Sequence, residues 1–89
     1  MTKLVVSEGF ERDMGMVESD RVFERILSTA KLLETMPFMG SRDVPESIAR
    51  KYEGQVRKVP VNPFDIVTIY HPDADIVEVA ALIHQRGAW

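Results

Sequence analysis

The sequence contains no cysteine, so neither a disulfide bond nor a zinc-thiolate site can stabilise the chain. It also lacks any apolar run approaching the roughly 18 residues that a membrane-spanning helix requires. The N-terminus offers only three apolar residues, Leu4 to Val6, before the acidic Glu8, which is too few for a signal peptide. These absences predict a cytoplasmic protein with no membrane contact, stabilised by its own packing or by a partner.

An excess of basic residues is absent too. The formal net charge is −3, which argues against indiscriminate nucleic-acid binding, because nonspecific affinity for phosphates needs a net basic surface. The charges are unevenly spread: residues 1–47 hold six basic and nine acidic side chains, and residues 48–89 hold five of each. A short stretch with the single acidic residue Glu53 predicts a local basic patch made of Arg50, Lys51, Arg57 and Lys58.

The length of 89 residues predicts one domain, 1–89, with a small core, because a chain of this size buries roughly 60 to 65% of its unfolded surface. Hydrophobic residues at 45% and charged residues at 28% are ordinary for a globular protein and argue against disorder.

The C-terminal half predicts a three-stranded antiparallel meander. Its strands are residues 55–61, 64–70 and 76–83, which are rich in β-branched and aromatic residues. Asn62-Pro63 and the segment 71–75, with its proline and aspartates, supply the turns. The last strand is apolar on both sides, with one face predicted as Val77, Val79, Ala81 and Ile83 and the other as Ile76, Ala80 and Leu82. Such a strand is expected to be central or covered by a partner.

The N-terminal half predicts a short strand, Lys3 to Ser7, followed by two helices. Ser7 is placed to cap the first helix, which is weakened by Gly9 and Gly15 and has an apolar face of Phe10, Met14 and Val17. Ser19 or Asp20 is placed to cap the second, which ends at Met36-Pro37 and carries the stripe Phe23, Ile26, Leu27, Ala30 and Leu33.

Residues 44–52 predict one or two further helical turns, with Pro45 at the first helical position. The order of elements indicates an α+β domain: a short N-terminal strand, then two helices packed on a mostly antiparallel sheet that ends in the meander.

The segment 56–70, followed by Ile83-His84-Gln85-Arg86, resembles the C-terminal half of the ParE/RelE toxin superfamily. The shared features are an arginine on the second strand, an aromatic that opens the third strand, a tyrosine near its end, and a histidine and an arginine close to the C-terminus: Arg57, Phe64, Tyr70, His84 and Arg86. Upstream, Val6-Ser7 with Phe10 and Asp13, and the helix end at 33–37 followed by Gly40, also fit. Residues 44–52 look like an insertion.

The resemblance implies the RelE/ParE-like fold and a toxin from a bacterial type II toxin-antitoxin system. A cognate antitoxin would neutralise it by folding its C-terminal segment against the toxin, giving a hetero-oligomer. ParE-like members inhibit DNA gyrase by binding, whereas RelE-like members enter the ribosome and cut messenger RNA. No cofactor is implied.

For RNA cleavage, the resemblance implies cations from Arg57 and Lys58, an acid or base from His84, and phosphate binding by Arg86. Asp65 departs from this pattern, because several family nucleases have an arginine there and a carboxylate would repel the scissile phosphate. A ParE-like, gyrase-binding toxin is therefore favoured, with a RelE-like ribosome-dependent endoribonuclease as the alternative. The residues expected to bind a target or antitoxin are Arg50, Lys51, Arg57, Tyr70, Arg86 and Trp89.

Plainer roles remain open for the same residues. Arg57 or Lys58 can pair with Asp65 on the neighbouring strand, and His84 can be a structural histidine. Tyr70 can be a packing residue, and Trp89 can be either an anchor or a contact residue. No metal is expected, because the histidines and turn aspartates match no known ligand spacing: His71, His84, Asp73 and Asp75.

Overall fold

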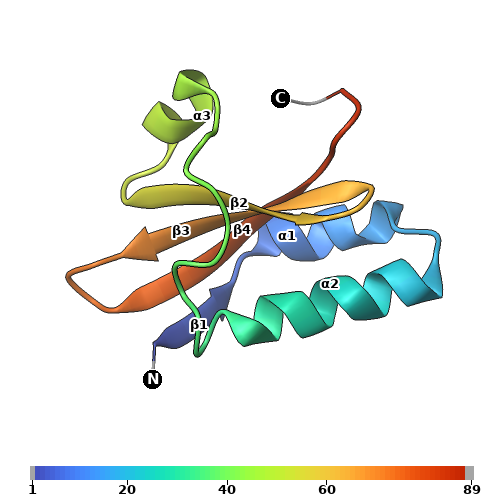
Figure 1. Cartoon of the computed structure of the whole chain (residues 1–89), viewed down its shortest axis with the longest axis horizontal. Coiled ribbons are helices and arrows are strands. Elements are labelled where there is room, and N and C mark those ends of the chain that lie inside the picture. Colours follow the sequence, from blue (N-terminus) through green and yellow to red (C-terminus); the bar gives the residue numbers. More distant parts are fainter. Residues whose placement is uncertain (1, 88–89) are drawn as a thin grey trace.

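The computed structural model describes residues 2–87 and has four strands in one sheet (Figure 1). The strand order is β1-β4-β3-β2, with β1 parallel to β4 and the other pairs antiparallel. The elements in chain order are β1 Lys3–Val6, α1 Glu8–Asp13, the 3₁₀ helix η1 Met14–Met16, α2 Asp20–Leu32, α3 Glu46–Lys51, β2 Gln55–Val61, β3 Phe64–His71 and β4 Ile76–His84. The predicted α+β architecture with its C-terminal meander is confirmed.

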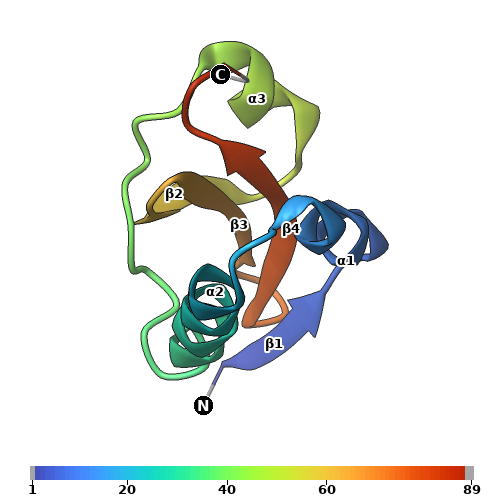
Figure 2. The ribbon, with the colours of Figure 1, turned by 90° about the vertical axis from the view of Figure 1, so that its right-hand side faces the viewer.

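Helices cover both faces of the sheet. Figure 2 shows α2 on one side and α3 on the other, with α1 beside β4. The side covered by α2 is called the helix side. It holds the helix-side cluster, to which α1 also contributes: Phe10, Met14, Ile26, Ala30, Leu33, Val59, Val61, Phe64, Ile66, Val77, Val79 and Leu82. The other side holds the α3-side cluster of Val56, Val67, Ile69 and Ala80, against which Val44, Ile48 and Tyr52 pack. β4 lies inside the sheet, so the prediction of a central strand is confirmed.

β4 contains a β-bulge that the sequence pattern did not reveal. Val67 of β3 pairs with Ala81 and Thr68 pairs with Val79, which leaves Ala80 as an extra residue. Ala80, Ala81 and Ile83 therefore all pack on the α3 side, whereas Leu82 joins Val77 and Val79 on the helix side. The predicted division of this strand into two faces is wrong after Ala80, because the bulge shifts the alternation by one residue.

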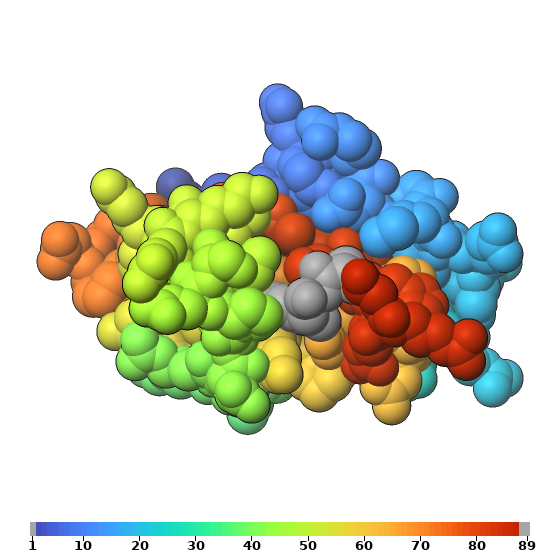
Figure 3. Space-filling model, turned by 90° about the horizontal axis from the view of Figure 1, so that it is seen from above, coloured from blue at the N-terminus to red at the C-terminus, as the bar shows by residue number. Residues whose placement is uncertain are grey.

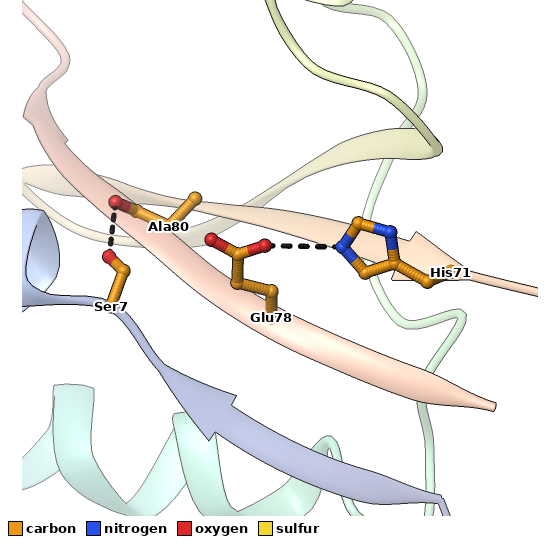
Figure 4. A network of polar contacts seen from close by, with 4 residues as sticks. All are labelled: Ser7, His71, Glu78 and Ala80. Carbon is orange, nitrogen blue, oxygen red and sulfur yellow. Dashed lines mark hydrogen bonds and ion pairs between the residues drawn. The ribbon is translucent and has the colours of Figure 1, made fainter. Parts of the chain in front are cut away.

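Two side chains from the α1 region hold the bulge. The Ser7 hydroxyl accepts a hydrogen bond from Phe10 N–H at 3.1 Å and so caps α1 as predicted. The same hydroxyl donates to the carbonyl oxygen of Ala80 at 2.8 Å (Figure 4). Leu82 N–H donates to the Asp13 carboxylate at 3.1 Å. α1 is thereby joined to β4 where the ladder is interrupted.

The helix boundaries differ from the prediction at two places. Ser19 caps α2 through a hydrogen bond from Val22 N–H, but the α-helix ends at Leu32 rather than at Met36-Pro37. Its last turn tightens, because Leu33 N–H bonds the carbonyl of Ala30, three residues back. Pro45 is the N-cap residue of α3 rather than its first helical residue.

One corner of the sheet is closed by Asp75, which has a positive φ of 51°. Its carboxylate accepts hydrogen bonds from the Thr2 hydroxyl and from the Tyr70 hydroxyl, both at 2.9 Å. Its carbonyl accepts from Lys3 N–H at 3.1 Å. The turn between β3 and β4 thus anchors the start of the chain. Within residues 2–87, no helix is long and apolar enough to cross a membrane.

Candidate binding surfaces

Arg57 and His84 lie on the helix side of the sheet but are not brought together. Arg57 on β2 pairs with Thr68, whereas His84 on β4 pairs with Phe64, four positions away along β3. That separation is about 13 Å along the strand, and β3 itself lies between the two residues. The core under α2 fills the space between them, since Ile66 and Val59 belong to the helix-side cluster.

Lys58 lies on the opposite face from Arg57. It alternates with Arg57 along β2 and shares the α3 side with Val56. Asp65 lies on that side as well, is 6% exposed, and accepts a hydrogen bond from Gln85 Nε2 at 3.0 Å. Of the two basic residues predicted to pair with Asp65, only Lys58 therefore shares its face.

His84 and Arg86 are neighbours at the end of β4. The His84 ring meets the Phe64 ring edge to face, with centroids 5.2 Å apart. Its Nδ1 accepts a hydrogen bond from Arg86 N–H at 3.2 Å, so a neutral ring carries its proton on Nε2. The ring also lines a hollow of about 310 Å³ beside η1 and the start of α2. His84 therefore has the contacts of a packing residue and retains one ring N–H for a ligand.

The other predicted binding residues are dispersed. Arg50 and Lys51 belong to α3, and Figure 3 shows the face of the molecule on which this helix lies. Arg50 forms an exposed ion pair with Glu46 at 2.7 Å, and the Lys51 ammonium lies 5.6 Å from the centre of the Tyr52 ring. Trp89 lies outside the described residues. Arg57 is on the other face of the sheet, so the predicted basic patch is divided between the two faces.

Tyr70 connects two contacts on the helix side. Its ring packs against that of Phe38 at a centroid distance of 4.7 Å, and its hydroxyl donates to Asp75. This hydrogen bond, then burial and the Asp75 charge, raise the pKa of the Tyr70 phenol. The hydrogen bonds from Tyr70 and then Thr2 lower the pKa of the Asp75 carboxyl. Tyr70 thus has the packing role that the sequence left open.

An apolar groove lies between α1 and α2, beside β1, and sequence reasoning did not find it. The α1–α2 groove has a volume of about 510 Å³. Its floor and walls are apolar, and charged residues stand at its rim: Leu4, Val6, Phe10, Met14, Phe23, Leu27 and Ala30, with Glu11, Lys31 and Glu34. Leu27, predicted as a core residue, is 43% exposed because it faces this groove.

The exposed large hydrophobic side chains of the described residues all come from the first half of the chain: Val5, Val6, Met16, Leu27, Leu32, Met36 and Phe38. Two of them, Val6 and Leu27, line the α1–α2 groove, and an apolar groove open to solvent is typical of an interaction site. The sequence signal for this groove was the width of the apolar stripe on α2. Ile26 is buried against the sheet, whereas Phe23 and Leu27 extend the stripe into the groove. Among residues 2–87, no three acidic, histidine or cysteine side chains gather as a metal site.

No protein-family model and no curated protein matches this sequence. The structure is similar to a chain in the crystal structure of the archaeal RelE-RelB complex from Pyrococcus horikoshii OT3, with a TM-score of 0.72 and 11% sequence identity. The match covers 99% of this chain and 100% of the other. The chain therefore shares the fold of that chain of the RelE-RelB complex, a RelE-like fold.

Proposed function

We propose that this chain is the toxin of a type II toxin-antitoxin system and that its antitoxin docks in the α1–α2 groove. The observation that carries the proposal is this apolar groove, lined by the exposed Val6 and Leu27, on a fold shared with a chain of a RelE-RelB complex. A solvent-exposed apolar hollow of this size is costly unless a partner covers it.

The groove fits an amphipathic antitoxin segment. Leu4 and Val6 line one wall, and Leu27 lines the other. A partner helix with apolar residues at three- and four-residue spacing would fill such a groove. Glu11 and Glu34 on the rim favour basic residues on the flanks of that segment, next to the exposed Lys31.

The toxin would act by binding a large target such as DNA gyrase, in the manner of ParE. This mode is favoured because Arg57 and His84 are separated by β3 and because Lys58 lies on the opposite face from Arg57. A binding toxin does not need these groups to converge on one phosphate. The RelE-like nuclease remains the alternative, and the following experiment decides between the two modes.

The test is induced expression of the chain in a bacterial host, alone and together with the neighbouring reading frame. Growth, messenger RNA 5′ ends and the DNA-damage response are followed in the same cultures. Growth arrest with DNA damage and intact transcripts is the expected result. New transcript cuts would mean that the chain acts by RNA cleavage rather than by binding a target. Unimpaired growth would contradict the toxin assignment.

The groove is tested by Leu27→Lys, with Ser28→Lys as the matched control at the next residue of α2, which does not line the groove. Leu27→Lys should leave the chain toxic but prevent neutralisation by the antitoxin, because a charge would be buried in an apolar interface. Ser28→Lys should remain neutralised. Equal neutralisation of both variants would place the antitoxin elsewhere.

A further inference from the structure

The β2 edge of the sheet is protected by the connector between α2 and α3. Ser41 and Lys58 exchange two backbone hydrogen bonds of 2.9 and 2.8 Å along this edge. Gly40, with a φ of 101°, allows the close approach, because an added Cβ would come within 2.4 Å of the Lys58 carbonyl oxygen. Alternation along β2 directs the backbone of Pro60 to the same side, and proline has no N–H to offer a further strand.

The β1 edge has no such protection. β1 is the end strand of the sheet and lies away from α3 (Figure 1). Lys3 N–H and Ser7 N–H both donate to carbonyl oxygens on the β4 side, so the odd-numbered residues of β1 face β4. The N–H and C=O groups of Leu4 and Val6 therefore face outward. Over residues 2–87, no strand pairs with them on that side.

The side chains of β1 leave apolar surface on both faces of the sheet beside this edge. Leu4 and Val6 point to the helix side, where they line the α1–α2 groove. Lys3 and Val5 point to the α3 side, because side chains alternate along a strand. Val5 is 37% exposed and Val6 is 42% exposed. An edge strand with unpaired backbone groups and exposed valines is a ready template for pairing with another strand.

We propose that β1 pairs with β1 of a second copy of this chain, antiparallel and about a two-fold axis through Val5. In this register Leu4 lies opposite Val6 of the second copy, and the two residues exchange both backbone hydrogen bonds. The outward groups of one copy are thus satisfied by the same groups of the other, and the contact closes after two copies. The dimer goes beyond the proposed function and does not depend on it.

The exposed Val5 side chain supports the position of the axis. Val5 lies opposite Val5 of the second copy in a non-hydrogen-bonded pair, where side chains on neighbouring strands come closest. Pairs of β-branched residues at such positions stabilise a sheet. On the other face, Leu4 and Val6 bring the two α1–α2 grooves next to each other across the axis.

The charges at the two ends of β1 favour the antiparallel arrangement. Lys3 lies opposite Ser7 of the second copy and next to the exposed Glu8, the first residue of α1. The two-fold axis repeats this pairing of opposite charges at both ends of the contact. A parallel arrangement in register would instead place Lys3 beside Lys3 of the second copy, where like charges repel.

The first measurement is sedimentation velocity of the purified chain from about 10 μM to about 1 mM, with amide hydrogen exchange resolved by NMR at the same concentrations. The chain should pass from monomer to dimer as its concentration rises. The Leu4 and Val6 amides should become protected in step with the dimer. The Val5 amide faces β4 in both states and should not change. A chain that stays monomeric throughout would overturn the proposal.

Val5→Lys should raise the dissociation constant of the dimer by about tenfold or more, because it places like charges opposite each other on the axis. Leu32→Lys is the matched control on α2, because Leu32 is also an exposed apolar residue, at 50%. It should leave the dissociation constant unchanged. Equal effects in the two variants would mean nonspecific apolar association and would overturn the dimer.

A charge exchange keeps the test valid if Val5→Lys does not fold. Lys3→Glu and Glu8→Lys should each weaken the dimer by about two- to tenfold, and the double variant should restore it. A general effect of net charge would act in opposite directions in the two single variants. Weakening without restoration in the folded double variant would overturn the antiparallel register.

Two further results would overturn the proposal. One is a dimer in which the Leu4 and Val6 amides remain unprotected, which would place the contact on another surface. The other is protection of these amides only when the product of the neighbouring reading frame is added, which would assign the edge to a strand of that partner. Neither toxicity nor neutralisation enters these measurements, so they stand apart from the test of the toxin assignment.

Discussion

Asp75 carries more structural roles than its place in a turn suggests. It adopts a positive φ, which aspartate tolerates better than most residues, and its carboxylate bonds Thr2 and Tyr70. These contacts connect the start of the chain, β3 and the turn before β4. One carboxyl group therefore links the turn before β4 to the nearby end of β3 and to Thr2, which is 73 residues away in sequence.

The protein should lose part of its stability in acid because of Asp75. Its folded pKa lies below the ordinary 3.8, so its stabilising effect is complete above that value and is lost as pH falls through the folded pKa. Asp75→Asn should make the acid limb of the free energy of unfolding against pH shallower, as measured by urea titration. An unchanged acid limb would contradict this role.

The hydrogen bond between Tyr70 and Asp75 also makes the free energy of unfolding depend on pH in alkaline solution, with the opposite sign. The folded pKa of Tyr70 lies above the ordinary 10.0, so its contribution is complete below that value and is lost as pH rises through the folded pKa. Tyr70→Phe should flatten the alkaline limb of the free energy of unfolding against pH. Because it removes one of the two side-chain hydrogen bonds to Asp75, it should also reduce the effect of Asp75→Asn on the acid limb.

His84→Gln should leave toxicity intact if the toxin acts by binding. In the structure His84 packs on Phe64 and accepts from Arg86 N–H, and glutamine retains a polar group of similar size there. Growth curves after induction, with circular dichroism as a check of folding, measure the effect. Loss of toxicity in a folded variant would support a chemical role for the histidine.

Arg86→Ala should abolish transcript cleavage if RNA is the substrate.

At the scale of elements, the sequence predicted every strand and both of the first two helices, including the caps at Ser7 and Ser19. Local signals determine these features: β-branched runs, turn residues and hydroxyl caps. The bulge at Ala80 was not predictable, because Ala80 and Ala81 look alike to any alternation pattern. It is held by Ser7 and Asp13, nearly the whole chain length away.

The connector between α2 and α3 depends on Gly40. Gly40→Ala should destabilise the protein by about 2 kcal/mol or more, because alanine is strained at positive φ and its Cβ would meet the Lys58 carbonyl. Gly15→Ala is the control: nothing lies within 4 Å of its added Cβ, and alanine should stabilise by up to about 1 kcal/mol. Urea unfolding measures both, and equal effects would contradict the special role of Gly40.

At the scale of the whole molecule, the candidate surfaces were the least predictable part. The sequence drew attention to Arg57 and His84 as candidate site residues, but the face and register that separate them follow from strand pairing. The α1–α2 groove combines β1, α1 and α2, and no local pattern specifies the space between three elements. The contact between the Phe38 ring and the Arg57 guanidinium was not predictable, because the two residues lie on segments that are separate in sequence.

Helix α3 and the strands β3 and β4 should differ in the free energy at which their backbone amides open to hydrogen exchange. α3 is six residues long, contains no buried residue, and covers the α3-side cluster mainly through Ile48 and its flanks. Native-state hydrogen exchange should therefore show α3 amides opening at a free energy well below that of global unfolding, whereas β3 and β4 amides should exchange only with global unfolding. Equal protection in α3 and β3 would contradict this ranking.

The parallel pairing of β1 with β4 also has a consequence in time. Among the strands that residues 2–87 form, β1 pairs only with β4, at partners such as Val6 and Val79, so β1 has no strand partner until β4 has been made. At roughly 5 to 20 residues per second, synthesis of the intervening chain takes about 4 to 15 seconds. During that interval Phe10 has no completed core to join, and Val5 and Val6 are exposed even in the finished fold. A partner that covers these side chains would find them accessible on the nascent chain, before the molecule is finished.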